Sequence, residues 1–220
     1  MKKTARIISI TAFVFLAISP LQSQKIAHYY IEMPNLLNPV ITKQQRLELL
    51  EYFKADMGDS IENRFGNQTR VLKMDTLNNC ILVQNTDISR FEMKIIENEN
   101  DTVIGIIKTV CTPICQSTID FYSLQWQKRS DITFDFPVAT DWLNLEKLTK
   151  LKLNEKNVRN SLSTSFISLS FNGETNEISA RNNSIEFLDK EERERLLPIM
   201  NTNEFTVYRY VNGRWVTNSF

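Results

Sequence analysis

Residues 103–126 read VIGIIKTVCTPICQSTIDFYSLQW, two apolar runs on either side of the turn Thr112-Pro113-Ile114. Two strands joined by so short a turn form an antiparallel hairpin, and we suppose a register in which Cys111 lies opposite Cys115. The other pairs are then Thr109 with Ser117, Ile107 with Ile119, Gly105 with Phe121, Ile104 with Tyr122 and Val110 with Gln116. Because apolar residues meet on both faces, we expect this hairpin at the centre of a sheet.

The N-terminus has the pattern of a secretory signal peptide. Three basic residues precede an apolar run at 7–18, and Pro20 ends that run. A membrane-spanning helix needs about 20 apolar residues, and this run is shorter. We therefore expect residues 1–23 to be a signal peptide, cleaved after Ser23, and residues 24–220 to be the exported chain. The alternative is an N-terminal anchor that is retained.

The expected export of the chain determines how its three cysteines are interpreted. In an exported protein, Cys111 and Cys115 are predicted to form a disulfide across the hairpin. Free thiols and a redox pair are the alternatives, but a redox pair usually has two intervening residues and a helix N-terminus to lower one thiol pKa. Cys80 is left over, and we expect it to be a buried free thiol that packs as a small apolar side chain.

Composition indicates an ordinary globular chain. The sequence is 42% hydrophobic, with 26 basic and 26 acidic residues, and removal of the signal segment takes away three basic residues and leaves a net charge of −3. Binding to nucleic acid needs a basic stripe, so we expect no nucleic-acid partner. No later segment reaches membrane-spanning length, so we expect no transmembrane span in the exported chain.

A helix is predicted from Thr42 to about Gly58. Thr42 and Gln45 have the spacing of a capping box, and apolar residues recur after them at helical spacing, at Leu47, Leu50, Phe53 and Met57. Residues 24–41, which contain two prolines, are expected to form a packed lead-in.

The remaining pattern is mostly that of antiparallel strands. Strands are predicted at 71–76, 80–85, 88–97, 132–136, 162–171 and 177–181. A connection or weak helix is predicted at 146–160 and a helix at 190–200. The chain is expected to end in a hairpin at 205–216 that pairs Tyr210 with Trp215. In strand 88–97, Phe91, Met93 and Ile95 alternate with Arg90, Glu92 and Lys94, so we expect one buried and one solvated face.

Few residues have the pattern of a catalytic or metal site. The single histidine, His28, lies in the lead-in, which disfavours most zinc sites and most Ser-His and Cys-His nucleophile pairs. Asp131 and Asp135 are four residues apart on one strand, about 13 Å at Cα, and are expected to be solvated. The charged run from Asp189 to Arg195 is expected to be a solvated helix face. We predict no catalytic residue, no metal site and no cofactor.

Two segments, IEMPNLLNPVITKQQRLELLEYF (31–53) and KTVCTPICQSTIDFYSLQW (108–126), resemble an uncharacterised family of exported proteins from Bacteroidetes-type bacteria. In that family a Met-Pro segment precedes a threonine-started helix, and a cysteine-proline turn precedes a Ser-Thr-x-x-Phe-Tyr strand and a tryptophan. The resemblance implies export in a Gram-negative cell and a small α+β fold. It carries no site residue, because the family has no assigned function.

The sequence thus predicts an α+β fold, with curved antiparallel sheets packed against two or three helices. Residues 24–220 are expected to form a single domain, with two sub-halves at 24–137 and 138–220 as an alternative. The predicted function is non-enzymatic binding of a protein, peptide or envelope component, in the periplasm, at the outer membrane or outside the cell. A small-ligand or lipid carrier and a histidine-independent hydrolase are the alternatives.

Overall fold

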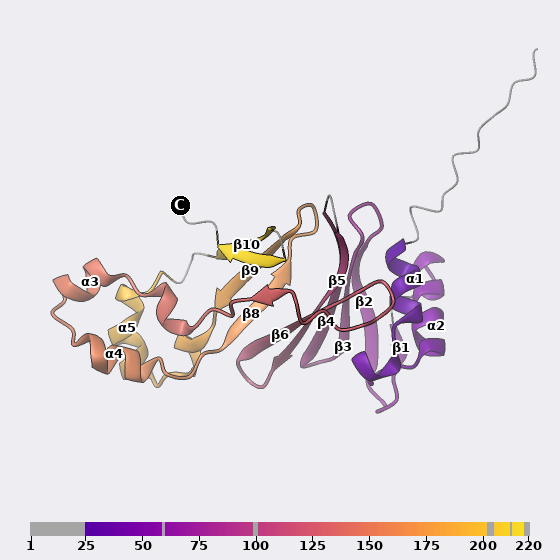
Figure 1. The fold of residues 1–220 in the computed structure, drawn as a ribbon. Coiled ribbons are helices and arrows are strands. Elements are labelled where there is room, and N and C mark those ends of the chain that lie inside the picture. The colour runs from indigo at the N-terminus through magenta and orange to yellow at the C-terminus, as the bar shows by residue number, and fades with distance from the viewer. Residues whose placement is uncertain (1–24, 59, 99–100, 202–204, 212, 218–220) are drawn as a thin grey trace, which may run out of the picture.

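The computed structural model describes residues 25–58, 60–98, 101–201, 205–211 and 213–217. Figure 1 shows an elongated molecule in which a helical pair, a first sheet, a second sheet and a cluster of short helices follow one another along the long axis. The protein is therefore α+β, as predicted. The proposed signal peptide lies outside the described residues, and the division at 137/138 stays a prediction.

The first sheet is a six-stranded antiparallel meander in chain order. Its strands are β1 (Ser60–Glu62), β2 (Gln68–Asp75), β3 (Cys80–Thr86), β4 (Ser89–Asn98), β5 (Asp101–Cys111) and β6 (Cys115–Tyr122). β5 and β6 pair in the predicted register, from Ile104 opposite Tyr122 to Cys111 opposite Cys115. A disulfide joins Cys111 and Cys115, whose Cα atoms are 3.9 Å apart.

The second sheet has five strands in the order β7-β11-β10-β9-β8. They are β7 (Thr133–Phe134), β8 (Ile167–Phe171), β9 (Glu177–Asn182), β10 (Thr206–Val211) and β11 (Arg214–Thr217). The predicted hairpin is confirmed, since Tyr210 lies opposite Trp215. The strand predicted at 132–136 contracts to the two residues of β7, which pair in parallel with β11.

Two helices cover one face of the first sheet. α2 (Lys43–Lys54) begins with the predicted capping box, because the Thr42 side chain accepts from the Gln45 N–H and the Gln45 side chain accepts from the Thr42 N–H. The lead-in contains a helix that the sequence did not predict, α1 (Lys25–Glu32), and a 3-10 turn, η2 (Asn35–Leu37). Met57 is a correction, since it lies beyond α2 and is 70% exposed.

Arg46 fixes these helices to each other from inside the first core. Its side chain is fully buried, and its guanidinium donates to the backbone carbonyls of Ile31, Met33 and Ile41 and to the Asn35 side chain. The Ile31 carbonyl lies in the last turn of α1, where helix carbonyls have no partner within the helix. A charged side chain thus takes the place of a helix cap between α1 and α2.

The short helices cover the second sheet. They are α3 (Leu145–Lys150), α4 (Glu155–Ser161), α5 (Lys190–Leu196), η3 (Ala139–Trp142), η4 (Ser184–Phe187) and η5 (Leu197–Ile199). They bury Trp142, Leu148, Val158 and Leu196 in a second core that also contains Ile107 and Phe121 of the first sheet. No described helix is both long and apolar enough to cross a membrane.

The face of β4 that was expected to be solvated is covered. Phe91, Met93 and Ile95 are buried under the helices, as predicted, but Lys94 on the opposite face is only 2% exposed. The covering element is β8, whose residue Phe171 packs so close to the first sheet that a Cβ added at Gly105 would lie 2.7 Å from its Cζ atom. Arg90, near the start of β4, is exposed as predicted and Glu92 is half-buried, whereas both faces of the strand are buried from Met93 to Ile96, because a segment far along the chain packs there.

Candidate binding groove between the two sheets

The junction of the sheets is built from the free edge of β8. An edge strand presents unpaired backbone groups, which a protein must cover or pair. Here the Leu169 N–H donates to the Ser117 hydroxyl over 2.9 Å, and the Phe171 N–H donates to the Glu92 carboxylate over 2.9 Å. Side-chain oxygens on the face of the first sheet thus accept hydrogen bonds from the backbone N–H groups at the edge of the second sheet.

Two further polar contacts hold this junction. The buried Asn183 side chain donates to the Cys115 carbonyl over 2.9 Å and to the Ser168 hydroxyl over 3.0 Å. The hydroxyls of Thr109 and Ser117 lie 2.7 Å apart. The disulfide-linked end of the β5–β6 hairpin is therefore fixed to the start of β8.

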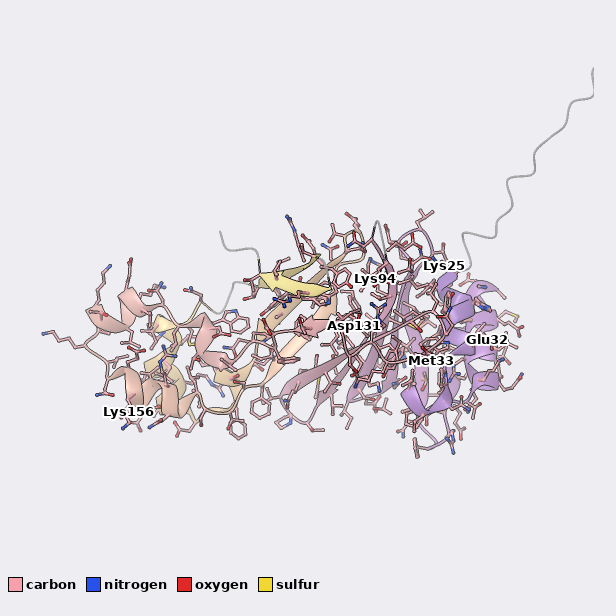
Figure 2. The ribbon with its side chains drawn as sticks, viewed as in Figure 1. Lys25, Glu32, Met33, Lys94, Asp131 and Lys156 are labelled. Atoms are coloured by element: carbon pink, nitrogen blue, oxygen red, sulfur yellow. A yellow bond between two sulfur atoms is a disulfide. The ribbon has the colours of Figure 1, made fainter. Side chains whose placement is uncertain are left out.

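Lys94 holds the turn that follows β8. Its ammonium group donates to the carbonyls of Asn78 (3.3 Å), Asn172 (3.1 Å) and Gly173 (3.0 Å). Burial lowers the Lys94 pKa, because the charged form loses hydration, but the three carbonyls pair all three of its N–H donors. Figure 2 labels Lys94 on the first sheet, and its bonds to Asn172 and Gly173 connect that sheet with the turn after β8.

A groove of about 250 Å³ remains beside these contacts. Arg90, Glu92 and Thr109 line it from the first sheet, and Ser168, Arg181 and Asn183 line it from the second. Glu92 also lines a smaller cavity of about 130 Å³ together with Lys73, Cys80 and Gly173. Leu169 and Phe205 add apolar surface, so the groove is a cleft of mixed character between two sheets, a common position for a binding site because two packed elements form its walls.

The charges in the groove are unevenly balanced. Burial raises the pKa of Glu92 to about 7, although the Phe171 N–H and the nearby positive charge of Arg90 act in the opposite direction. Among the described residues, Arg181 is 3.9 Å from Glu186, a long and exposed ion pair that contributes little. Two arginines and one carboxyl group with a raised pKa thus line the same groove.

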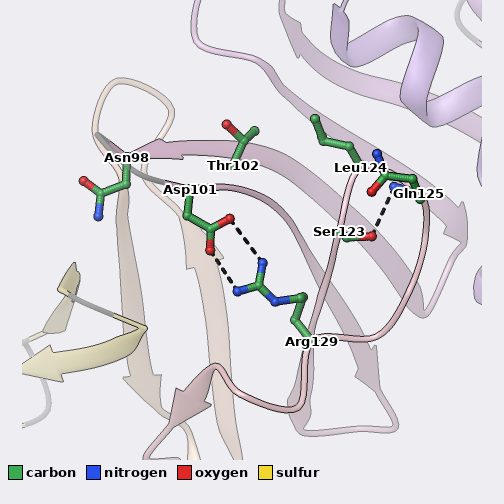
Figure 3. A pocket seen from close by; sticks show the side chains of 7 residues that line it. All are labelled: Asn98, Asp101, Thr102, Ser123, Leu124, Gln125 and Arg129. Atoms are coloured by element: carbon green, nitrogen blue, oxygen red, sulfur yellow. Dashed lines mark hydrogen bonds and ion pairs between the residues drawn. The ribbon is translucent and has the colours of Figure 1, made fainter.

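A second, more open pocket of about 440 Å³ lies where β5 begins, lined by Asn98, Asp101, Thr102, Ser123, Leu124, Gln125 and Arg129. Figure 3 shows Arg129 and Asp101 paired across it, with nitrogen–oxygen distances of 2.9 and 3.2 Å. Arg129 also binds Asp131 over 2.7 Å, which lowers the pKa of Asp131 to about 2. Because its one arginine is held by two carboxylates, this pocket is the weaker candidate.

The residues considered in the sequence for catalysis, metal binding or a disulfide lie apart from the groove, with the exception of Cys115. His28 is exposed on α1 against the edge of Tyr29, Asp135 is exposed, and Asp189 caps α5 by accepting from the Glu192 N–H. Cys80 is buried and free, as predicted. Within the described ranges, no group of three or more His, Cys, Asp or Glu residues is arranged to hold a metal ion.

The sequence reasoning missed Arg90, Glu92, Arg181 and Asn183. One signal was available for the first two. The predicted hairpin register places Ile107 and Phe121 on one face, and two large apolar residues there indicate that this face is covered. The structure shows that Arg90 and Glu92 share that face, since Glu92 lies opposite Ile107. The contribution of β8 and β9 had no local signal.

Two sheets that meet at a groove, with helices at both ends, define a two-sheet α+β protein with an open site between the sheets. The chain belongs to the family described as "Protein of unknown function (DUF3256)", whose model matches residues 18–215. The expected resemblance to an uncharacterised family is thereby confirmed.

A solved structure with the same fold comes from Porphyromonas gingivalis W83, a domain of an uncharacterized protein. The TM-score is 0.73 at 22% sequence identity, over 89% of this chain and 98% of the other. This likeness shows the fold alone. No curated protein matches the chain.

Proposed function

We propose that this protein is an exported, non-enzymatic binding protein that uses the groove between its sheets to hold a protein, peptide or envelope component. The observation that carries the proposal is the open groove lined by Arg90, Arg181 and Asn183 from both sheets. Exposed charged side chains at the rim of a preformed cleft provide directional contacts to a polar partner, and the buried Asn183 helps to keep the cleft in place.

The chemistry of the groove supports this function over a lipid carrier. A carrier encloses an apolar ligand in a cavity of several hundred Å³ with mostly apolar walls, whereas the groove is small, at about 250 Å³, and is lined by two arginines and a glutamate besides its apolar surface. The larger pocket near Arg129 is polar.

One observation favours a second candidate, a histidine-independent hydrolase. A carboxyl group with a pKa of about 7 in a cleft, such as Glu92, can act as a general base near neutral pH. The Phe171 N–H occupies one oxygen of that carboxylate, so a binding role fits better. Hydrolysis of a chromogenic ester or glycoside that is lost in Glu92→Gln would favour the hydrolase instead.

The binding function is tested by affinity purification from cross-linked envelopes of the native organism, followed by mass spectrometry. The same purification is done with the double variant Arg90→Gln/Arg181→Gln, which removes both charged side chains that are proposed to hold the partner. A partner recovered with the wild-type protein and lost with the variant is the expected result. A co-purifying lipid without any macromolecular partner would contradict the proposal and favour a carrier.

Export is tested separately. Cell fractionation combined with intact-mass measurement should give a protein in the envelope or medium that begins at Gln24. A cytoplasmic protein with an uncleaved N-terminus would contradict export and leave the groove argument unaffected.

A further inference from the structure

We infer that the groove between the sheets binds a carboxylate of an acidic peptide segment, with Arg90 and Arg181 as the two groups that hold it. This inference rests on the proposed binding function and names the chemistry of the partner. It is carried by two exposed arginines, one from each sheet, that line the same small cleft.

The two arginines come from different sheets. Arg90 is on β4, opposite Thr109 of β5, and Arg181 is on β9, opposite Ser168 of β8. No carboxylate among the described residues forms an ion pair with Arg90, and the ion pair of Arg181 with Glu186 is long at 3.9 Å. Both guanidinium groups therefore keep N–H donors for a ligand, and their planar fork matches the two oxygens of a carboxylate.

The floor of the groove is already ordered. The Asn183 side chain is 5% exposed and donates to Cys115 and Ser168, and Thr109 is bonded to Ser117. The side chains of the floor are therefore held in place, whereas the exposed arginine side chains can change their conformation to meet a ligand. A ligand that binds here does not have to order the floor, which lowers the cost of binding.

The size and charge of the site favour a carboxylate over a larger or more highly charged anion. The groove of about 250 Å³ accommodates a short side chain. Glu92 lies at the same site, and its negative form repels a phosphate dianion more strongly than a single carboxylate charge. The exported chain carries a net charge of −3, so attraction of an acidic partner is a local property of this groove.

A peptide is favoured by the surface around the groove. Ser170 and Ser179 are opposed on β8 and β9 at its margin, and Phe205, which is 59% exposed, also lines it. Serine hydroxyls can bond to peptide groups, and an exposed aromatic ring can cover an adjacent apolar side chain. A chain passing over these residues places one acidic side chain, or its C-terminus, between the arginines.

The test uses the purified protein on an array of octapeptides. One set contains Asp and Glu, and a matched set replaces them by Asn and Gln. We expect retention on the acidic set alone, and fluorescence anisotropy on the retained peptides should show affinity weakened about tenfold or more in Arg90→Gln and in Arg181→Gln. Arg214→Gln, an exposed arginine on β11 outside the groove, should bind as the wild type does.

Three outcomes would overturn the inference. They are equal retention on both peptide sets, unchanged affinity in both groove variants, and competition by inorganic phosphate or acetate as strong as that of the acidic peptide. If the acidic set is not retained while an envelope partner is still recovered, the inference fails and the proposed function stands. Circular dichroism of each variant, together with the partly conservative Arg90→Lys, separates lost binding from lost folding.

Discussion

The ionisation of Glu92 makes the stability of this protein depend on pH in a way that can be measured. Burial raises the pKa of Glu92 from its ordinary value of 4.5 to about 7. Below the lower value the carboxyl group is protonated in both folded and unfolded chains. Between the two values the folded chain binds more protons, so the free energy of unfolding falls as pH rises.

The size of the effect follows from the shift. One pKa unit corresponds to about 1.4 kcal/mol, so the full shift corresponds to about 3 kcal/mol. Glu92→Gln removes the titrating group, and an amide oxygen can still accept from the Phe171 N–H. We expect the stability of the variant relative to the wild type to rise by about 3 kcal/mol between about pH 4 and about pH 8.

Urea unfolding at a series of pH values measures this difference directly. Glu51→Gln, at an exposed position on α2, is the matched control and should show no comparable trend. A difference between wild type and Glu92→Gln that stays constant across the series would refute the reasoning, because it would mean that the carboxyl group ionises equally well in both states.

Three other predictions follow from the packing. Gly105→Ala should destabilise the protein by about 1–3 kcal/mol, because the new Cβ meets the Phe171 ring. In the background of Phe171→Leu the same substitution should destabilise less. If the changes in unfolding free energy of the two variants simply add in a double-mutant cycle, the contact is contradicted. Arg46→Met should lower the free energy of unfolding by about 3 kcal/mol or more, since it leaves buried carbonyls unpaired. The control Arg64→Met, at an exposed position, should change it by about 0.5 kcal/mol at most. If urea unfolding gives the same loss of stability for both variants, the role assigned to Arg46 is wrong. Cys111→Ser/Cys115→Ser should lower the melting temperature only modestly, because the disulfide closes a short loop. Thiol titration of the denatured, non-reduced wild-type protein should detect one free thiol, that of Cys80. Detection of three free thiols would show that no disulfide forms.

Local patterns predicted the parts of the fold that depend on nearby residues. The register of the Cys111–Cys115 hairpin and the capping box of α2 both follow from residues a few positions apart. The Tyr210–Trp215 pair was predictable for the same reason, because a short turn between two strands fixes their register.

The missed features depend on contacts between distant segments. Glu92 and Lys94 alternate with apolar residues and so resemble a solvated face, yet the end of β8 and the turn after it, about 80 residues later in the chain, bind them. α1 was missed because its stability comes largely from burial of Ile26 and Tyr30 against the first sheet and from Arg46. The groove could not be predicted because its second wall is set by how the two sheets dock.

The pairing of the β8 edge by side chains has a consequence for the order of folding. The first sheet is a meander of sequential hairpins, whose contacts are local and form quickly. The Leu169 and Phe171 amides find their acceptors, Ser117 and Glu92, only on that finished surface. The first sheet should therefore act as a template, and in pulse-labelling hydrogen exchange the amides of β4 and β5 should gain protection before those of Leu169 and Phe171.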